Sequence, residues 1–244
     1  MYKSILAYII YWFLGDFMRE LEYNANYSLG RKHPTINKVR IIDDKTNFPI
    51  SWLNSQDYCE YSIYLENFQG IKVDDTEAMK RGTRIHNRLE DDFKKEAEVM
   101  SLDEIILRSH DEEIVSREFQ VISPEYGIRG FIDEIWLSPD RIVIIDDKPG
   151  SRAFNSMKHQ VYAYCLAYRE QMNDSRPLVA ALRTRGTSNI FWQHVFDKEC
   201  EDRIVGIIDH MQRLISGEDF FTSTDNPRKC GACRFSGVCP NSLI

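Results

Sequence analysis

Gly130-Phe131-Ile132-Asp133, followed thirteen residues later by Asp146-Asp147-Lys148, is the stretch that decides the fold of this chain. Residues 127–137 and 141–148 are two apolar runs that predict β-strands, with a turn at Ser138-Pro139-Asp140 between them. Successive side chains of a strand point to opposite faces of a sheet. The two strands therefore predict a hairpin in which Asp146 and Lys148 share one face and Asp147 takes the other.

The length of the turn decides whether the acidic residues of this hairpin meet. A four-residue loop over residues 138–141 pairs Leu137 with Ile142 and sets Asp133 opposite Asp146. A three-residue loop would separate the two carboxylates. Directly opposed side chains lie roughly 5 Å apart at Cβ, and two carboxylates at that separation repel each other unless a cation lies between them. We expect the four-residue loop and a metal ion; the alternative is a polar hairpin end that is only solvated.

The composition describes one large folded domain and limits the kinds of partner. The chain has 244 residues, of which 43% are hydrophobic and 12% aromatic, enough to form a buried core. Its formal net charge of -7 excludes binding of nucleic acid by bulk positive charge, but not a local basic groove on an enzyme. Six cysteines in a chain of this length are not the disulfide framework of a small secreted protein, and we expect a cytoplasmic location.

The first residues form an apolar segment that predicts a helix. Residues 5–14 are strongly apolar, about half of the length that a bilayer crossing needs. The segment has a weak positive start and no clear cleavage site, which argues against a signal peptide. We predict a helix over residues 2–23 packed on the core, without membrane association. A membrane-surface anchor through Tyr8, Tyr11 and Trp12 is the alternative.

Two helices are predicted before the hairpin. Ser51 is expected to cap a helix over residues 52–67 that carries Cys59, and Thr76 to open a longer one. In the longer helix, apolar residues and His86 recur at steps of three and four, so they share the inward face. His86 is then either a core histidine bonded to backbone or a ligand near the hairpin.

Further strands and helices surround the hairpin. Residues 155–172 predict a helix in which Gln160 and Tyr164 lie one turn apart, so that their polar ends can act together. The alternative for both side chains is ordinary packing. Strands are predicted over residues 113–122, 178–184 and 189–196, and a helix capped by Asp197 runs to about residue 216. This order indicates a single α/β or α+β domain.

Three closely spaced cysteines near the end of the chain predict a metal or cluster site. They are Cys230, Cys233 and Cys239, with glycine and proline among them. Four thiolates complete a tetrahedral zinc site or an iron–sulfur cluster, so a fourth cysteine must come from elsewhere. Cys165 and Cys200 are expected inside helices, where buried thiols are usually inert, whereas Cys59 has polar neighbours. Cys59 is the expected fourth ligand, and zinc is the alternative to a cluster.

Taken together, these motifs resemble the RecB-type branch of the PD-(D/E)XK nucleases that carries an iron–sulfur cluster. This branch includes the small CRISPR-associated nucleases of spacer acquisition and exonuclease V. The motifs, in order, are Cys59, Arg81-Gly82 with His86, Gly130-x-x-Asp133, Asp146-x-Lys148, Gln160-x-x-x-Tyr164, and Cys230-x-x-Cys233 with Cys239-Pro240. They span about three quarters of the chain. Each motif is weakly specific alone, but six in the order of the family are strongly specific.

The resemblance implies a fold and a metal site. The fold would be α/β, with a restriction-endonuclease-like PD-(D/E)XK core in which helices flank a mixed central sheet. Residues 1–50 would form an N-terminal helical extension, and residues 51–244 the nuclease domain with a C-terminal Fe–S cluster subdomain. The metal, Mg²⁺ or Mn²⁺, would be bound by His86, Asp133, Asp146 and the backbone carbonyl of Asp147.

The resemblance also implies catalytic and structural roles. Lys148 would position the attacking water or stabilise charge on the phosphate, and Gln160 and Tyr164 would orient Lys148 and the DNA backbone. The implied catalytic set is Lys148, Asp133, Asp146, Gln160 and Tyr164. A [4Fe–4S] cluster would be held by Cys59, Cys230, Cys233 and Cys239.

The implied activity is metal-dependent hydrolysis of DNA by an exonuclease. Its substrate would be single-stranded DNA or single-stranded ends, in CRISPR spacer acquisition, antiviral defence or DNA repair. The residues expected to contact phosphate are Lys148, Arg152, Lys158, Arg183 and Arg185. Two features depart from the family: about 45 residues precede its usual start, and Asp147 is acidic where the family often has an aromatic residue. Because Asp147 is expected to face away from the site, its effect on the metal should be small.

Two other functions fit parts of the sequence. A DNA-binding or assembly protein would use the Fe–S cluster and the groove to hold DNA or an integrase, with little or no cleavage of its own. A redox sensor would use the cluster as a switch, and only the cysteines favour it. Loss of cleavage in Asp133→Ala, Asp146→Ala and Lys148→Ala variants would favour the nuclease over both alternatives.

Overall fold

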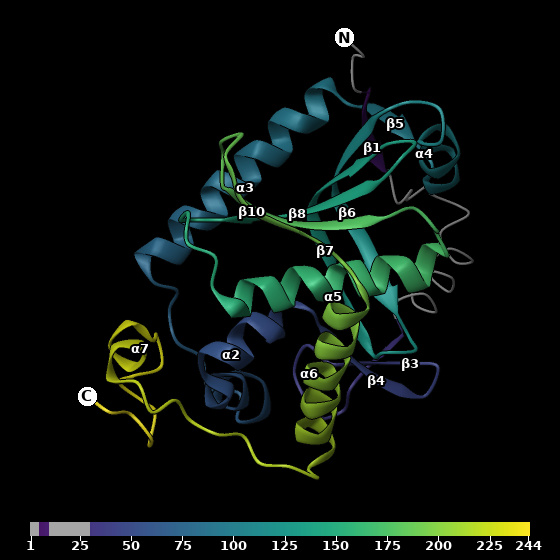
Figure 1. Ribbon diagram of the computed structural model, residues 1–244. Coiled ribbons are helices and arrows are strands. Elements are labelled where there is room, and N and C mark those ends of the chain that lie inside the picture. The colour runs from purple at the N-terminus through teal and green to yellow at the C-terminus, as the bar shows by residue number, and fades with distance from the viewer. Residues whose placement is uncertain (1–4, 10–29) are drawn as a thin grey trace, which may run out of the picture.

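The computed structural model describes residues 5–9 and 30–244 and is built around a ten-stranded mixed sheet (Figure 1). The strands are β1 (Ile5–Ile9), β2 (Arg31–Lys32), β3 (Arg40–Ile42), β4 (Lys45–Pro49), β5 (Glu98–Met100), β6 (Ile114–Ser123), β7 (Ile128–Leu137), β8 (Ile142–Lys148), β9 (Leu178–Thr184) and β10 (Ile190–Val195). The helices are α2 (Ser51–Ile63), the π-helical turn η1 (Tyr64–Phe68), α3 (Glu77–Glu96), α4 (Leu102–Arg108), α5 (Asn155–Met172), α6 (Lys198–Ser216) and α7 (Pro227–Ala232).

The hairpin of β7 and β8 has the predicted register. Leu137 pairs with Ile142 and Glu134 with Ile145, and the Ser138 amide donates to the Arg141 carbonyl oxygen at 3.0 Å to close the loop. The four-residue loop is therefore confirmed. Continued by one step, this register sets Asp133 beside Asp146.

The pairing of β7 is interrupted at the motif that opens the sequence. β6 runs antiparallel along the whole of β7. Two strands share the other edge of β7. β8 pairs only with residues 134–137 of β7, and β4 pairs in parallel only with Ile128 and Arg129. Residues 130–133 lie between these two ladders, so Gly130 and Asp133 stand where neighbouring strands separate.

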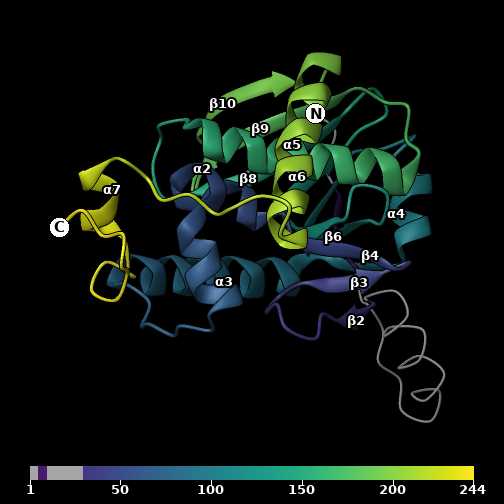
Figure 2. The ribbon, with the colours of Figure 1, turned by 90° about the horizontal axis from the view of Figure 1, so that it is seen from below.

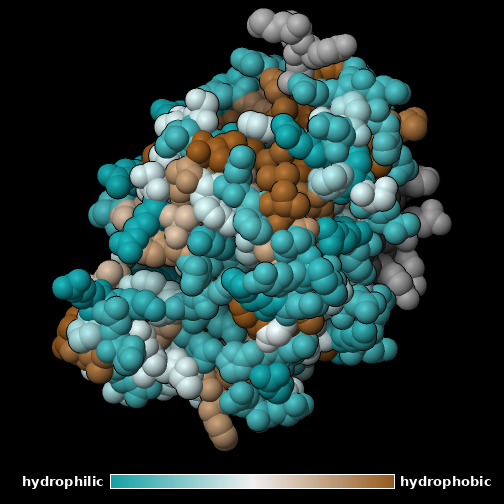
Figure 3. Space-filling view, in the orientation of Figure 1, coloured by the Kyte–Doolittle hydropathy of each residue, from teal (hydrophilic) through white to brown (hydrophobic). Residues whose placement is uncertain are grey.

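Helices cover the two faces of the sheet unequally. α5 packs on one face through a run of nine buried residues, from Gln160 to Tyr168, and α6 packs against α5. Figure 2 shows α3 and α5 on opposite sides of the strands. On the face away from α5, Val143, Ile145 and Ala181 form a smaller apolar cluster. In the view of Figure 3, apolar side chains are visible at the surface in the upper half of the molecule, where Figure 1 shows the strands.

The N-terminal segment differs from the prediction. Ile5–Ile9 is strand β1, which pairs in parallel with β5 and β6, so the predicted helix is wrong over these residues. A short apolar run suits a buried strand as well as a helix, and here pairing with distant strands decides between them. Tyr11, Trp12 and the rest of the predicted helix lie outside the described residues. Within residues 5–9 and 30–244, no helix combines the length and apolar character that a bilayer crossing requires.

The later helices begin and end close to the predicted positions, with one exception. The Thr76 hydroxyl accepts from the Met79 amide at 3.3 Å at the start of α3, and Asp197 caps α6. Ser51 is not the cap of α2, because Ile50 occupies that position and no side chain bonds there. α2 is also interrupted at Cys59, whose backbone is extended (φ -171°, ψ 107°). The interruption turns Cys59 out of the helical path.

Candidate active site

The side chains that the sequence assigns to the metal and to catalysis meet at the gap beside residues 130–133. They come from four elements: His86 from α3, Asp133 from β7, Asp146 and Lys148 from β8, and Gln160 and Tyr164 from α5. A continuous chain of contacts under 4 Å runs from His86 to Tyr164. Residues far apart in the sequence thus form one polar site at the edge of a buried sheet.

Asp133, which is half-buried, and Asp146, which is buried, are two carboxyl groups that influence each other. Asp133 Oδ2 accepts a hydrogen bond from the Asp147 amide at 2.7 Å. Burial and the charge of Asp146 raise the pKa of Asp133 to about 7. Burial also raises the pKa of Asp146, although Lys148 opposes the shift. A cation between the two groups would favour the ionised form of both.

Lys148 is held between β8 and α5. Its Nζ lies 2.6 Å from Asp146 Oδ2 and donates to Gln160 Oε1 at 2.8 Å. The Gln160 amide donates in turn to the Tyr164 hydroxyl at 3.3 Å. Tyr164 therefore positions Gln160, and Gln160 in turn fixes the position of the Lys148 ammonium group.

Two glycines allow this close packing. A Cβ at Gly130 would lie 2.8 Å from Tyr164 Cε1, and a Cβ at Gly82 would lie 2.8 Å from Arg185 Nη1. Carbon atoms in optimal contact are about 3.5–4.0 Å apart. Any larger residue at Gly130 would therefore push Tyr164 away from β7, which explains why a glycine precedes Asp133 in this motif.

Glu118 of β6 is a site residue that the sequence analysis missed. Its Oε1 lies 3.1 Å from His86 Nε2, and this contact is the main cause of the raised pKa of His86. Glu118 has φ 50° in the middle of a strand, a left-handed conformation that is uncommon outside glycine. Strained backbone of this kind is typical of functional sites, where the surrounding structure maintains it.

The left-handed residue also reverses the alternation of side chains in β6. Arg117 contacts Glu90 of α3 on one side of the sheet, whereas Phe119 contacts Tyr168 of α5 on the other. Regular alternation would place both on the same side. No sequence pattern signals this reversal, so the inward position of Glu118 was not predictable from periodicity.

Arg185, just after β9, also reaches the site. Its Nη2 donates at 2.8 Å to the Asp147 carbonyl oxygen, which is one of the expected metal ligands. Its own amide donates to the Lys148 carbonyl oxygen at 2.8 Å. Arg185 Nε is buried and has no hydrogen-bond partner. A carbonyl oxygen has two lone pairs, so the Asp147 carbonyl can accept from Arg185 and still face an ion.

A second charged cluster lies behind the site, toward α3. Arg183 donates to Asp147 Oδ1 at 2.7 Å and to Glu134 Oε1 at 2.6 Å, and Arg117 donates to Glu134 Oε2 at 2.6 Å. All four side chains are buried. The Asp147 carboxylate therefore points away from the site, as expected. Arg183 was wrongly expected to contact phosphate, because β9 directs it into this buried cluster.

The donor set of the site fits a divalent cation. His86, Glu118 and Asp133 each place one ligand atom within 4.8 Å of the others. Asp146 Oδ2 and Glu118 Oε1 are buried and have no hydrogen bond of good geometry, although each lies near a basic group. Carboxylate oxygens suit Mg²⁺, and an imidazole shifts the preference toward Mn²⁺.

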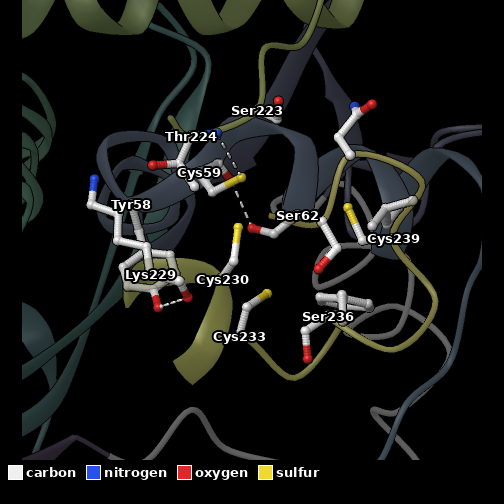
Figure 4. Close-up of a pocket in the computed structure, with 14 residues that line it drawn as sticks. Tyr58, Cys59, Ser62, Ser223, Thr224, Lys229, Cys230, Cys233, Ser236 and Cys239 are labelled. Atoms are coloured by element: carbon white, nitrogen blue, oxygen red, sulfur yellow. Dashed lines mark hydrogen bonds between the residues drawn. The ribbon is translucent and has the colours of Figure 1, made fainter. Parts of the chain in front are cut away.

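The four cysteines assigned to a cluster lie around one pocket between α2 and the C-terminal tail. Figure 4 shows the sulfur atoms of Cys59, Cys230, Cys233 and Cys239 around a common space. Cys165 and Cys200 lie elsewhere and are buried. The fourth cysteine that joins the tail is thus Cys59, which the sequence favoured for its polar neighbours.

The backbone at Cys59 is shaped for this position. The extended residue leaves its carbonyl oxygen outside the helical pattern, and the Ser62 hydroxyl donates to that oxygen at 2.7 Å. The Thr224 amide points to the Cys59 sulfur at 3.4 Å. The Tyr58 hydroxyl donates to the Lys229 carbonyl oxygen at 2.6 Å. These contacts fasten the tail to α2 on both sides of the sulfur.

A family model described as the PD-(D/E)XK nuclease superfamily matches residues 100–240, more than half of the chain. No curated protein matches. Among solved structures, one named "Putative exonuclease" from Eubacterium rectale is 15% identical to this chain. The match covers 81% of this chain and 91% of that chain, with a TM-score of 0.46. Another, named SSO0001, is 14% identical to this chain. The match covers 93% of this chain and 95% of that chain, with a TM-score of 0.41.

Proposed function

The chain belongs to the PD-(D/E)XK nuclease superfamily, and from this premise we propose that it is a divalent-metal-dependent deoxyribonuclease that digests DNA from an end. One observation carries the proposal. His86, Asp133, Asp146 and Lys148 come from three separate elements and converge beside the gap in β7. Lys148 also donates a hydrogen bond to Gln160, and Gln160 donates one to Tyr164, both on a fourth element, α5. A lysine that lay there only by chance would not be expected to have these partners.

In this proposal His86, Asp133 and Asp146 hold the metal ion, with the Asp147 carbonyl as a further ligand and Glu118 beside His86. The buried oxygens Asp146 Oδ2 and Glu118 Oε1 support it, because within the described residues each has only one basic neighbour and no hydrogen bond of good geometry, so a cation can still bind there. When bound, a divalent ion polarises a phosphodiester oxygen and lowers the pKa of water. The site would hold Mg²⁺ or Mn²⁺.

Lys148 acts on the reacting phosphate in this proposal. Its ammonium group is fixed by Asp146 and Gln160 and can stabilise negative charge that develops on the phosphate, or position the attacking water. Tyr164 is a positioning residue, because its hydroxyl meets Gln160 rather than the site itself. Arg185 adds a buried donor, Nε, that has no partner within the described residues and that a phosphate oxygen would satisfy.

The cysteine site is proposed to hold a [4Fe–4S] cluster with a structural role. A zinc ion with Zn–S bonds of about 2.3 Å would keep its sulfurs about 3.8 Å apart. Among the residues that the structure describes, no three of the four sulfurs lie within 4.8 Å of one another. This wider spacing favours a cluster, whose iron–sulfide core separates the cysteines.

The finer features of the substrate rest on the resemblance to the RecB-like, CRISPR-associated nucleases. They are a preference for single-stranded DNA and a role in spacer acquisition or in DNA repair. Exposed Arg152, in the segment that joins Lys148 to α5, and half-buried Lys158, in the first turn of α5, remain candidates for phosphate contact. Co-purification with an integrase would favour spacer acquisition.

The proposal is tested by following end-labelled single-stranded and double-stranded DNA with Mg²⁺ or Mn²⁺. We expect release of short products from single strands by the wild type, and none by Asp133→Ala, Asp146→Ala or Lys148→Ala. Arg228→Ala, which removes an exposed charge on α7, is the control. Undiminished cleavage by the three variants would refute the proposal. Iron content and visible absorption of anaerobically purified protein test the cluster separately.

A further inference from the structure

A third group of metal-ligating side chains lies at the edge of the sheet, where β10 ends and α6 begins. It consists of His194, Asp197 and Cys200, spaced His-x-x-Asp-x-x-Cys. We propose that these three residues bind a zinc ion, at a site separate from the nuclease centre and from the four cysteines of the tail. The nuclease site uses none of them.

The separation of the ligand atoms fits a tetrahedral zinc ion. One nitrogen, one oxygen and one sulfur atom lie within 4.8 Å of one another, and His194 Nδ1 is 3.6 Å from Cys200 Sγ. Zinc bonds of about 2.3 Å to sulfur and about 2.0–2.1 Å to nitrogen, at a tetrahedral angle, place those two atoms about 3.6 Å apart. The distance between these two ligand atoms is therefore already that of a tetrahedral zinc site.

The start of α6 holds two of the ligands in place. Asp197 Oδ1 accepts from the Cys200 amide at 2.9 Å, which orients the carboxylate and leaves its second oxygen for the ion. Cys200 lies in the first turn of α6, where the helix dipole favours a thiolate. Zinc binds the thiolate, so binding would release the thiol proton.

The third ligand, His194, is supported by aromatic neighbours. Its ring stacks on Trp192, with centroids 6.2 Å apart and an angle of 7° between the planes, and Tyr162 contacts it edge-on. Nδ1 also lies 2.7 Å from the Val195 carbonyl oxygen. In the metal-free protein a proton on Nδ1 is donated to that oxygen. To bind zinc through Nδ1, the ring would turn away from the Val195 carbonyl oxygen and release this proton to solvent.

Three protein ligands leave one position open. His194 and Asp197 are exposed and line a surface hollow together with Trp136 and Val179, whereas Cys200 is 6% exposed. Water can therefore reach the ion and complete its coordination. Bound zinc would join the end of β10 to the first turn of α6, and it would stabilise the edge of the sheet without entering the reaction.

The experiment titrates Co²⁺ into the purified, cluster-containing protein and follows the thiolate-to-cobalt absorption. We expect one equivalent to bind to the wild type with this absorption, and Zn²⁺ to displace it. Cys200→Ser should remove the absorption, and His194→Gln should weaken binding at least about tenfold. DNA cleavage by both variants should equal that of the wild type.

Two controls make the result decisive. Cys165→Ala removes a different buried thiol and should leave the absorption unchanged, and Cys233→Ser tests whether the tail cysteines contribute to it. Zn²⁺ should also raise the melting temperature of the wild type by more than that of His194→Gln, which keeps only the nuclease centre as a divalent-cation site. Full binding by either Cys200→Ser or His194→Gln, or loss of the absorption in Cys233→Ser alone, would overturn the proposal.

Discussion

Two charged clusters lie back to back on the strands β7 and β8, and adjacent acidic residues supply both. Asp133 and Asp146 enter the site, whereas their neighbours Glu134 and Asp147 enter the cluster toward α3. In the cluster toward α3, Arg117 and Arg183 balance Glu134 and Asp147 through hydrogen bonds, and Glu90, which lies 3.7 Å from Arg117, is paired in turn with Lys94. In the site, three carboxylates lie beside one lysine and one histidine, while Arg185 binds a backbone carbonyl oxygen rather than a carboxylate. Among the described residues, two of the carboxylate oxygens have an ion pair but no hydrogen bond of good geometry.

The difference separates a structural cluster from a functional one. A buried, balanced network stabilises one arrangement of strands, because removal of any member leaves an opposite charge unpaired. A buried group of carboxylates that outnumber their basic partners raises the free energy of the folded protein, and a bound cation lowers it. Charge balance, rather than the number of charged residues, therefore distinguishes the proposed nuclease centre from the structural cluster on these strands.

The largest effect is expected when the unbalanced cluster loses a carboxylate. Asp146→Asn should lower the rate of DNA cleavage on the order of 10³-fold, because a metal ligand and the partner of Lys148 are lost together. Its unfolding free energy should fall less than that of Asp147→Asn, because Lys148 keeps Gln160 as an acceptor and the variant removes a charge that burial disfavours. Single-turnover cleavage and urea denaturation check both parts. An Asp146→Asn protein as destabilised as Asp147→Asn would contradict the comparison.

The matching change in the balanced cluster should give the opposite result. Asp147→Asn leaves Arg183 and Arg117 without one of their two carboxylates, and should cost about 3 kcal/mol or more of unfolding free energy. Cleavage per folded molecule should change far less than in Asp146→Asn. Urea denaturation measures the loss. If Asp147→Asn were as stable as the wild type, the cluster toward α3 would have no structural role.

Much of this arrangement was predictable from the sequence, because it depends on local rules. The length of the turn after Leu137 fixed the register of the hairpin, and strand alternation then separated Asp147 from Asp146 and Lys148. Helical spacing placed Gln160 above Tyr164. Each of these relations involves residues within one hairpin or one helix, where backbone geometry leaves few choices.

The parts that were not predictable depend on distant strands or on unusual backbone. Ile5–Ile9 forms a strand because β5 and β6 lie beside it, and no pattern within the segment shows that. Arg183 was misplaced because the register between parallel β8 and β9 is set by tertiary packing. Glu118 was missed because a left-handed residue inside a strand breaks the alternation on which the reasoning relied.

A smaller loss of stability and of cleavage is expected when Gly130, which leaves room for Tyr164 beside β7, is replaced by alanine. Gly130→Ala places a methyl group 2.8 Å from Tyr164 Cε1, and overpacking of this kind costs about 1–3 kcal/mol. Displaced Tyr164 and Gln160 would release Lys148, so cleavage should fall as well. Gly150→Ala is the matched control, because nothing lies within 4 Å of its Cβ. Equal behaviour of the two variants would show that the approach of Tyr164 is not required.

The smallest effect concerns a balanced pair outside both clusters, Asp174 with Arg176. Burial opposes ionisation of Asp174, but hydrogen bonds from Arg176 outweigh it and lower the pKa below its usual value. The pair therefore adds stability above the ordinary pKa of an aspartate, and this stability is lost as the pH falls through the lowered value. Asp174→Asn should cost about 1 kcal/mol at pH 7, less than Asp147→Asn, because Arg176 keeps its hydrogen bonds to the Ser109 and Ser138 carbonyl oxygens. Denaturation curves of variant and wild type should converge at acidic pH.

The central claim is that the unbalanced cluster is completed by a metal ion, and binding of Mn²⁺ tests it most directly. Electron paramagnetic resonance would count the bound ions in the Cys200→Ser background, so that the proposed zinc site does not contribute. The account predicts one Mn²⁺ per chain, lost in Asp133→Asn and retained in Glu134→Gln. No bound Mn²⁺ in the parent protein, or equal binding by Asp133→Asn, would contradict it.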